Sequence, residues 1–173
     1  GLLPEQVSAH LQSLRTDRTL DDYGHVLIRF ADSVLGAVTV SQITHGRLND
    51  LTLEIDGSLA SLAWRQETPN ELIVRRFGKP VQIYERNPNA DFTHAASRAA
   101  CRLPAGHPEA FFEAFANVYR SSYDQMIAHA TGQPVDQRDT IFPNVHDGIE
   151  GVEFIEQCVA SSADNGSWQP LSS

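Results

Sequence analysis

Residues 51–64, LTLEIDGSLASLAW, contain a complete β-hairpin and decide the class of fold. Every second residue from Leu51 to Ile55 is apolar, and this period of two predicts a half-buried strand. Asp56-Gly57 is among the strongest short-range signals for a hairpin turn, and a second strand then runs to Trp64. The stretch therefore predicts antiparallel pairing in the middle of the chain.

Further strands are predicted on both sides of this hairpin, with the ranges Gln6–Leu14, Tyr23–Phe30, Leu35–Ile43, Glu71–Phe77 and Val81–Arg86. Helical spacing appears after the strands, first from Pro108 to Thr131 and again from Asp147 onward. A block of strands followed by helices predicts an α+β fold, a large, mainly antiparallel open sheet with two main helices packed on one face. The order excludes alternating βαβ units, and with them a dinucleotide-binding fold formed by these residues.

The first predicted helix carries aromatic and apolar residues at steps of three and four, which we expect to be buried in the core. They are Phe112, Phe115, Tyr119, Tyr123, Met126 and Ile127.

Composition narrows the classes of function. The 173 residues, 41% hydrophobic and 20% charged, are typical of one globular domain, which we expect to span residues 1–173. A net charge of −9 disfavours binding to nucleic acid or to an anionic membrane, and no apolar run approaches the ~20 residues that span a bilayer. Cys101 and Cys158 form no CxxC; two free thiols in a reducing, cytoplasmic compartment is the simpler interpretation, and one disulfide is the alternative.

The chain begins with Gly1, and its one methionine is Met126. We interpret it as a processed product or an excised domain, with part of its chemistry expected upstream.

One face of the predicted sheet mixes small and polar side chains, which are Ser8, His10, Gln12, Arg29, Thr39, Ser41, Thr52 and Glu54. Such a face is either solvated or buried against another subunit, since interfaces are about as polar as ordinary surface. We favour a homodimer or a higher homo-oligomer formed through this face.

Two places are candidates for substrate binding. His107 precedes the predicted helix that opens at Pro108, where free N–H groups favour anions and hydroxyl oxygens; the alternative is a residue that caps the helix or packs the loop. Trp64, Glu67 and Asn70 belong to a polar and aromatic cluster suited to sugar hydroxyls; the alternative is a core tryptophan followed by an ordinary hairpin loop.

Motifs for other chemistry are missing from the sequence, which contains no GxGxxG, P-loop, HExxH, CxxC or nucleophile elbow. Asp21 and His25 have the spacing of an acid–histidine pair on a helix, but they lie at the entry of a strand, where residues four apart are about 13 Å from each other. We therefore assign no catalytic, cofactor-binding or metal-binding residue to this chain.

Several segments taken in order resemble the C-terminal domain of the Gfo/Idh/MocA oxidoreductases, the family of glucose–fructose oxidoreductase and the inositol dehydrogenases. The resemblance runs from about Val7 to Leu171 and is carried by Asp22-Tyr23, Arg29-Phe30, Val40-Ser41-Gln42, Glu54-Ile55-Asp56-Gly57, Leu62-Ala63-Trp64, Gln66-Glu67, Pro69-Asn70-Glu71-Leu72 and Gly106-His107-Pro108-Glu109.

The resemblance implies an open antiparallel sheet that shapes a substrate pocket and builds a dimer. It also implies a separate N-terminal Rossmann domain that binds NAD or NADP, and hydride transfer between the nicotinamide and a carbon that bears a sugar or cyclitol hydroxyl. The catalytic lysine and the Asp-x-x-x-His pair of the family are not matched here, so their role is not transferred to Asp21 and His25. On this basis the chain is the C-terminal domain of a dehydrogenase and inactive alone; the alternative is a non-catalytic dimerisation or ligand-sensing module.

Overall fold

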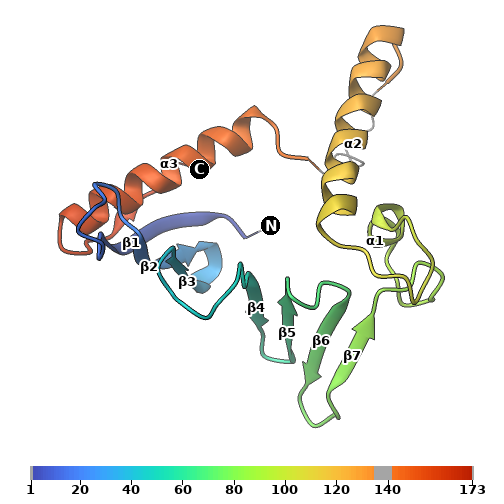
Figure 1. Cartoon of the computed structure of the whole chain (residues 1–173), viewed down its shortest axis with the longest axis horizontal. Coiled ribbons are helices and arrows are strands. Elements are labelled where there is room, and N and C mark those ends of the chain that lie inside the picture. The colour runs from blue at the N-terminus through green and yellow to red at the C-terminus, as the bar shows by residue number, and fades with distance from the viewer. Residues whose placement is uncertain (1, 135–141, 173) are drawn as a thin grey trace. The chain divides into compact units, whose positions relative to one another are not determined.

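The computed structural model describes residues 2–134 and 142–172, and its architecture is α+β, as predicted from the sequence (Figure 1). The strands are β1 (Pro4–Gln12), β2 (Tyr23–Phe30), β3 (Leu35–Ser41), β4 (Thr52–Asp56), β5 (Ala60–Arg65), β6 (Glu71–Arg76), β7 (Gln82–Glu85) and β8 (Gln169–Pro170). The helices are α1 (Ala95–Ala100), α2 (Phe111–Thr131) and α3 (Val145–Ala163), with a short 3-10 turn, η1, at Ala31–Ser33. The chain divides into two compact parts, residues 1–46 with 143–173 and residues 47–142.

The first part contains a four-stranded antiparallel sheet in the order β3-β2-β1-β8, and α3 packs against β1. Alternation along β1 and β2 places the apolar residues on the face that meets the helix. The core consists of Val7, Ala9, Val26, Ile28 and Cys158, all less than a tenth exposed. Burial of this apolar face is the main source of stability in this part.

Two serines of α3 complete the hydrogen bonding of β1. β8 pairs with β1 only at Gln6 and Val7. Farther along, the Ser161 hydroxyl accepts the Ala9 N–H at 2.8 Å and the Ser162 hydroxyl accepts the Leu11 N–H at 2.9 Å. The free edge of the strand is thereby satisfied by helix side chains instead of another strand.

Gly166 lets the chain return closely over β1. It has φ 80°, and a Cβ at this position would lie 2.6 Å from the His10 ring. Its carbonyl accepts the Ser8 hydroxyl at 2.6 Å, and Ser8 is 9% exposed. The expectation that Ser8 lies on an open sheet face is therefore wrong, because the turn after α3 covers it.

The second part contains a four-stranded antiparallel sheet in sequence order, β4-β5-β6-β7. Among the described residues the strands form two sheets of four, where the sequence suggested one wide sheet. The division falls after β3, where Gln42 still donates its N–H to Asp22. The chain then turns through Gly46 at φ 87° and Asp50 at φ 46° before β4 begins.

The helices differ from expectation at their starts and in their packing. α2 begins at Phe111, not Pro108, and α3 begins at Val145 behind the N-cap Asn144. The aromatic stripe expected in the core is exposed along α2; Phe112 is 83% and Tyr119 60% exposed. The assignment of this stripe to the core was wrong, because its spacing indicates an amphipathic helix but not what covers it.

Candidate functional site

A cavity of about 1100 Å³ lies within the second part of the chain and is lined by strands β5, β6 and β7 together with α1 and the start of α2. Cross-strand pairs Leu62 with Val74 and Leu72 with Tyr84 set side chains of the same sheet face next to one another. These residues and Trp64 line the cavity. A pocket with an apolar wall and a few polar groups at its rim is typical of small-molecule sites.

Trp64 stands in the cavity wall with its polar atom already satisfied. Its indole Nε1–H donates to the Pro69 carbonyl at 3.0 Å. The ring therefore offers the cavity a flat apolar surface rather than a hydrogen-bond donor, and such surfaces suit the C–H faces of ring-shaped ligands.

Asn70 also lines the cavity and uses both ends of its amide within the protein. Its Nδ2 donates to the Glu109 carbonyl at 2.8 Å, and its Oδ1 accepts the Glu109 N–H at 3.1 Å and the Arg86 Nε–H at 2.9 Å. This side chain joins the start of β6 to the segment that precedes α2.

Glu67 is exposed and does not line this cavity. Its carboxylate accepts the Asp50 N–H at 3.3 Å, so it ties the turn after β5 to the segment before β4. Gln66 beside it does line the cavity, and its Oε1 accepts the Asn49 amide at 2.7 Å. The structure thus brings Trp64 and Asn70 together and leaves Glu67 at the periphery.

His107 lies on an adjacent hollow of about 490 Å³, which Asn70 and Arg86 also line. The imidazole is exposed, and its Nδ1 is 3.3 Å from the Ala105 carbonyl. Because α2 begins at Phe111, His107 stands four positions before the first helical residue and outside the first turn. Its ring is free to meet a ligand, but not through the helix terminus on which the sequence argument relied.

Arg86 and Glu109 form a buried ion pair that the sequence did not reveal. The Arg86 guanidinium is 3.6 Å from the Glu109 carboxylate, and the two side chains are 16% and 7% exposed. Glu109 Oε1 also accepts the N–H groups of Arg102 and Leu103. The partners are 23 positions apart, so no local spacing marks them.

The start of α2 is fixed by Glu113, another residue of the cavity. Its carboxylate accepts the Ala110 N–H at 2.9 Å, and this hydrogen bond lowers the pKa of Glu113. Asn117, one turn farther on, donates to the Ala100 carbonyl at 2.7 Å and accepts from Arg102 Nε at 2.9 Å. These contacts hold the first turns of α2 to the end of α1.

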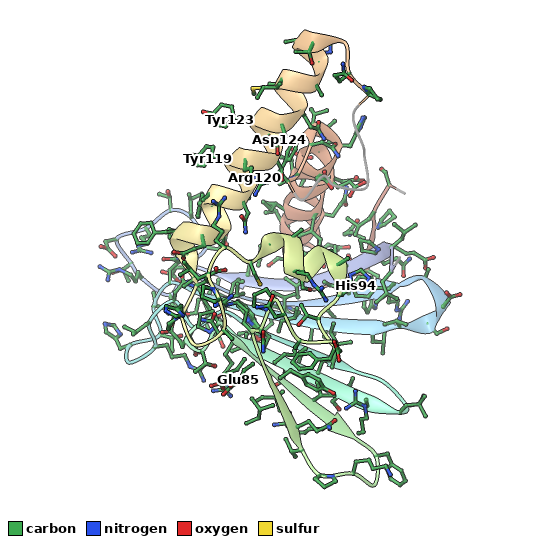
Figure 2. All side chains as sticks on the ribbon, turned by 90° about the vertical axis from the view of Figure 1, so that its right-hand side faces the viewer. Glu85, His94, Tyr119, Arg120, Tyr123 and Asp124 are labelled. Carbon is green, nitrogen blue, oxygen red and sulfur yellow. The ribbon has the colours of Figure 1, made fainter. Side chains whose placement is uncertain are left out.

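Residues 119–124 of α2 form a surface that does not line this cavity. Tyr119 and Tyr123 project from one side of the helix, with Arg120 and Asp124 nearby, as Figure 2 shows. Arg120 Nε and Asp124 Oδ2 are 3.7 Å apart and both exposed. A pair this open to solvent contributes little stability.

Asp21 is not among the hydrogen-bond partners of His25. The His25 ring bonds the Tyr23 hydroxyl at 2.9 Å and Thr39 Oγ1 at 3.0 Å. The buried carboxylate of this region is Asp22, 3% exposed, which accepts the N–H groups of Leu14 and Arg15 and closes the turn between β1 and β2.

Within residues 2–134 and 142–172, no cluster of three or more His, Cys, Asp or Glu has a metal-binding arrangement. No helix in the same ranges is both long and apolar enough to cross a membrane.

Comparison with known proteins identifies the class. Residues 1–171 match the model of the oxidoreductase family, C-terminal alpha/beta domain (Gfo/Idh/MocA). A Bacillus subtilis (strain 168) protein named as an uncharacterized oxidoreductase is 31% identical over 149 residues, which are 86% of this chain and 37% of the relative.

Solved structures agree. An oxidoreductase from Sinorhizobium meliloti is 34% identical with a TM-score of 0.89, and the match covers 98% of this chain and 47% of that one. An inositol dehydrogenase homolog from Azotobacter vinelandii, complexed with NADH and myo-inositol, is 30% identical with a TM-score of 0.90, covering 98% and 44%.

The chain therefore belongs to the Gfo/Idh/MocA oxidoreductase family and corresponds to its C-terminal domain. It spans less than half the length of these relatives.

Proposed function

We propose that this chain is the substrate-side domain of an NAD(P)-dependent dehydrogenase that acts on a sugar or a cyclitol. The observation that carries the proposal is the cavity over β5–β7, whose wall combines the Trp64 ring and other apolar side chains with polar groups. Ring-shaped polyols have C–H faces that pack on aromatic rings and hydroxyls that hydrogen-bond at the rim. The structural relative that holds NADH and myo-inositol supports the same class of ligand.

The reaction would oxidise a secondary alcohol. A base removes the hydroxyl proton while the hydride on the same carbon passes to the nicotinamide of NAD or NADP, leaving a ketone, the reduced dinucleotide and a proton. The base and the dinucleotide-binding fold belong to an N-terminal Rossmann domain outside this chain. The domain alone would therefore be inactive.

The contribution of this chain would be to hold the polyol. Trp64 supplies the flat wall, His107 supplies an exposed ring that can exchange hydrogen bonds with a hydroxyl, and Asn70 holds the backbone of Glu109, two residues after His107. Glu67 acts from the periphery, through the segment before β4.

The test uses the full-length protein with NAD or NADP and a panel of neutral cyclitols and pyranoses, followed by the absorbance of the reduced nicotinamide. Trp64→Ala should raise KM for the polyol about tenfold while dinucleotide affinity stays within twofold, because the wall is lost and the nucleotide site is elsewhere. Tight NADH binding by residues 1–173 alone would contradict this division of labour.

A non-catalytic dimerisation or ligand-sensing module is the second candidate, and one observation favours it. The Trp64 N–H and both ends of the Asn70 amide are already bonded within the protein, so these residues also suit a purely structural role. His107→Ala separates the two candidates. Unchanged turnover and KM in the full-length variant would remove this residue from the substrate shell and favour the module.

The homodimer and the cytoplasmic location are proposed on separate grounds. Exposed leucines on the outer face of β2 and β3 favour a subunit contact, which is argued below. Cys101 and Cys158 are both free thiols in the described structure, which suits a reducing compartment.

A further inference from the structure

Arg86, directly after β7, has its guanidinium held by the protein through four hydrogen bonds and an ion pair. Its Nε donates to Asn70 Oδ1 at 2.9 Å. Its two terminal nitrogens donate to three carbonyls of one segment, those of Leu103 at 2.8 Å, Pro104 at 3.1 Å and His107. The nitrogen that donates to Leu103 also forms the ion pair with the Glu109 carboxylate.

These contacts occupy most of the hydrogen-bonding capacity of the side chain. A guanidinium has five N–H donors in a rigid plane; here four of them donate to an acceptor within the protein, and the nitrogen that carries the fifth lies 3.6 Å from the Glu109 carboxylate. Arg86 therefore has at most one donor left for a substrate hydroxyl, and that donor lies beside the Glu109 carboxylate, although Arg86 lines both cavities. Arg86 acts on the site through the backbone segment that it holds.

The backbone of that segment depends on side-chain contacts, because it has no hydrogen-bonded helix or strand of its own. Residues 101–110 contain no helix or strand, and Gly106 has φ 80° with nothing within 4 Å of the place of a Cβ. Glu109 holds the beginning of the segment through the N–H groups of Arg102 and Leu103, and Arg86 holds its carbonyls. Contacts from Arg86, which follows β7, and from Asn70, which precedes β6, thus hold the backbone on both sides of His107.

We propose that Arg86 is a positioning residue of the substrate site, which sets the place of His107 by clamping residues 103–107 and pairing with Glu109. The inference rests on the proposed function, because it assigns an effect on polyol binding. Lysine cannot replace arginine here, since a single ammonium group cannot serve carbonyls along a planar fork.

The experiment compares Arg86→Lys with Arg75→Lys in the full-length protein. Arg75 lies on β6, is exposed and lines neither cavity, so it controls for the loss of a guanidinium. For Arg86→Lys we expect a KM for the polyol at least about tenfold higher, a smaller change in kcat and an unchanged dissociation constant for NADH. Amide hydrogen exchange should become faster in residues 102–110 and stay the same elsewhere.

A double-mutant cycle identifies the path of the effect. If Arg86 acts through His107, Arg86→Lys adds little to KM in a His107→Ala background. Additive effects, or a KM for Arg86→Lys within twofold of the wild type, would overturn the inference. If Arg86→Lys does not fold, Glu109→Gln takes its place in the same cycle, since it weakens the same ion pair, and the same two outcomes decide.

If the proposed function is wrong, the wild-type protein will oxidise no polyol with either dinucleotide, and this result is known before any variant is compared. An active wild type whose Arg86→Lys variant keeps its KM refutes the role of Arg86 alone.

Discussion

Ser161 joins a helix to a sheet edge through one hydroxyl. It is fully buried, accepts the Ala9 N–H at 2.8 Å and donates to the Ser167 carbonyl at 2.6 Å. Removing the hydroxyl leaves a donor and an acceptor without partners, and each buried unsatisfied group costs about 1–3 kcal/mol. Ser161→Ala should therefore lower the free energy of unfolding by roughly 2 kcal/mol, even though alanine is the better helix former.

Urea unfolding followed by circular dichroism measures this loss. Ser162→Ala is the matched control, because Ser162 makes the equivalent bond to the Leu11 N–H at a partly buried site where water can replace it. We expect the control to lose less than half as much. Equal losses in the two variants would show that burial of the Ser161 hydroxyl is not the decisive factor.

The two cysteines should differ in reactivity and in their effect on alkaline stability. Cys158 is 4% exposed, and burial raises the pKa of its thiol, whereas Cys101 is partly exposed. The folded protein holds the Cys158 proton more tightly than the unfolded chain. The resulting stability is complete below the unfolded pKa of about 8.5 and is lost as pH rises through the higher folded value.

We expect a thiol reagent at pH 8 to label Cys101 at once and Cys158 only as fast as the protein opens. Cys158→Ala should flatten the fall in stability between pH 8 and 10. Rapid labelling of both thiols in the native protein would contradict the burial of Cys158.

At the scale of the element, β6 and β7 contain a like-charge pair. Glu71 faces Glu85 across the two strands, and both side chains are exposed. Like charges directly opposite one another destabilise a sheet, and an opposite pair contributes roughly 0.2–1 kcal/mol. Glu85→Lys should therefore raise the free energy of unfolding by about 0.5–1 kcal/mol at low salt.

Thermal unfolding at two salt concentrations checks this prediction. Glu85→Gln removes the repulsion without adding an attraction, so it should fall between wild type and Glu85→Lys. Salt should shrink the differences, because both charges are screened. A lysine variant no more stable than the glutamine variant would mean that the two side chains do not interact.

The strands and helices show how much of the secondary structure could be predicted from the sequence. The strands were predicted closely because alternation is a property of each strand alone, as in β4 and β5 around Asp56-Gly57. Helix starts were less accurate because they depend on particular caps. Asp147 accepts the Asn144 N–H as the third residue of α3, where the sequence argument had taken it as the start. α1 was missed because six residues rich in alanine have no apolar period.

At the scale of the whole molecule, contacts between residues far apart in the sequence limit how much of the candidate site can be predicted. Trp64 and Asn70 were chosen for their chemistry, and they do line one cavity. Arg86 and Glu109 could not be chosen as a pair, since they lie 23 positions apart and the fold alone brings them together. The spacing of aromatic residues predicted α2 but could not show which surface covers them, because periodicity defines a face and not its partner.

Dimerisation is the remaining prediction at this scale. On β2 and β3 the pairs Leu27 with Ala37 and Arg29 with Leu35 lie on the face opposite the core, and Leu27 and Leu35 are 52% and 73% exposed. Exposed leucines among polar groups are typical of a subunit interface, and a sheet face is readily buried against its own copy. We therefore expect the full-length protein to form a dimer through this face.

Leu35→Glu should weaken that dimer by at least about tenfold in dissociation constant, because burying a carboxylate costs hydration that its cross-strand neighbour Arg29 only partly offsets. Sedimentation velocity over a range of concentrations measures the shift. Leu20→Glu is the control, since Leu20 is 77% exposed in the turn between β1 and β2, away from the sheet face. A wild-type monomer at high concentration, or equal weakening by both substitutions, would show that this face does not hold the subunits together.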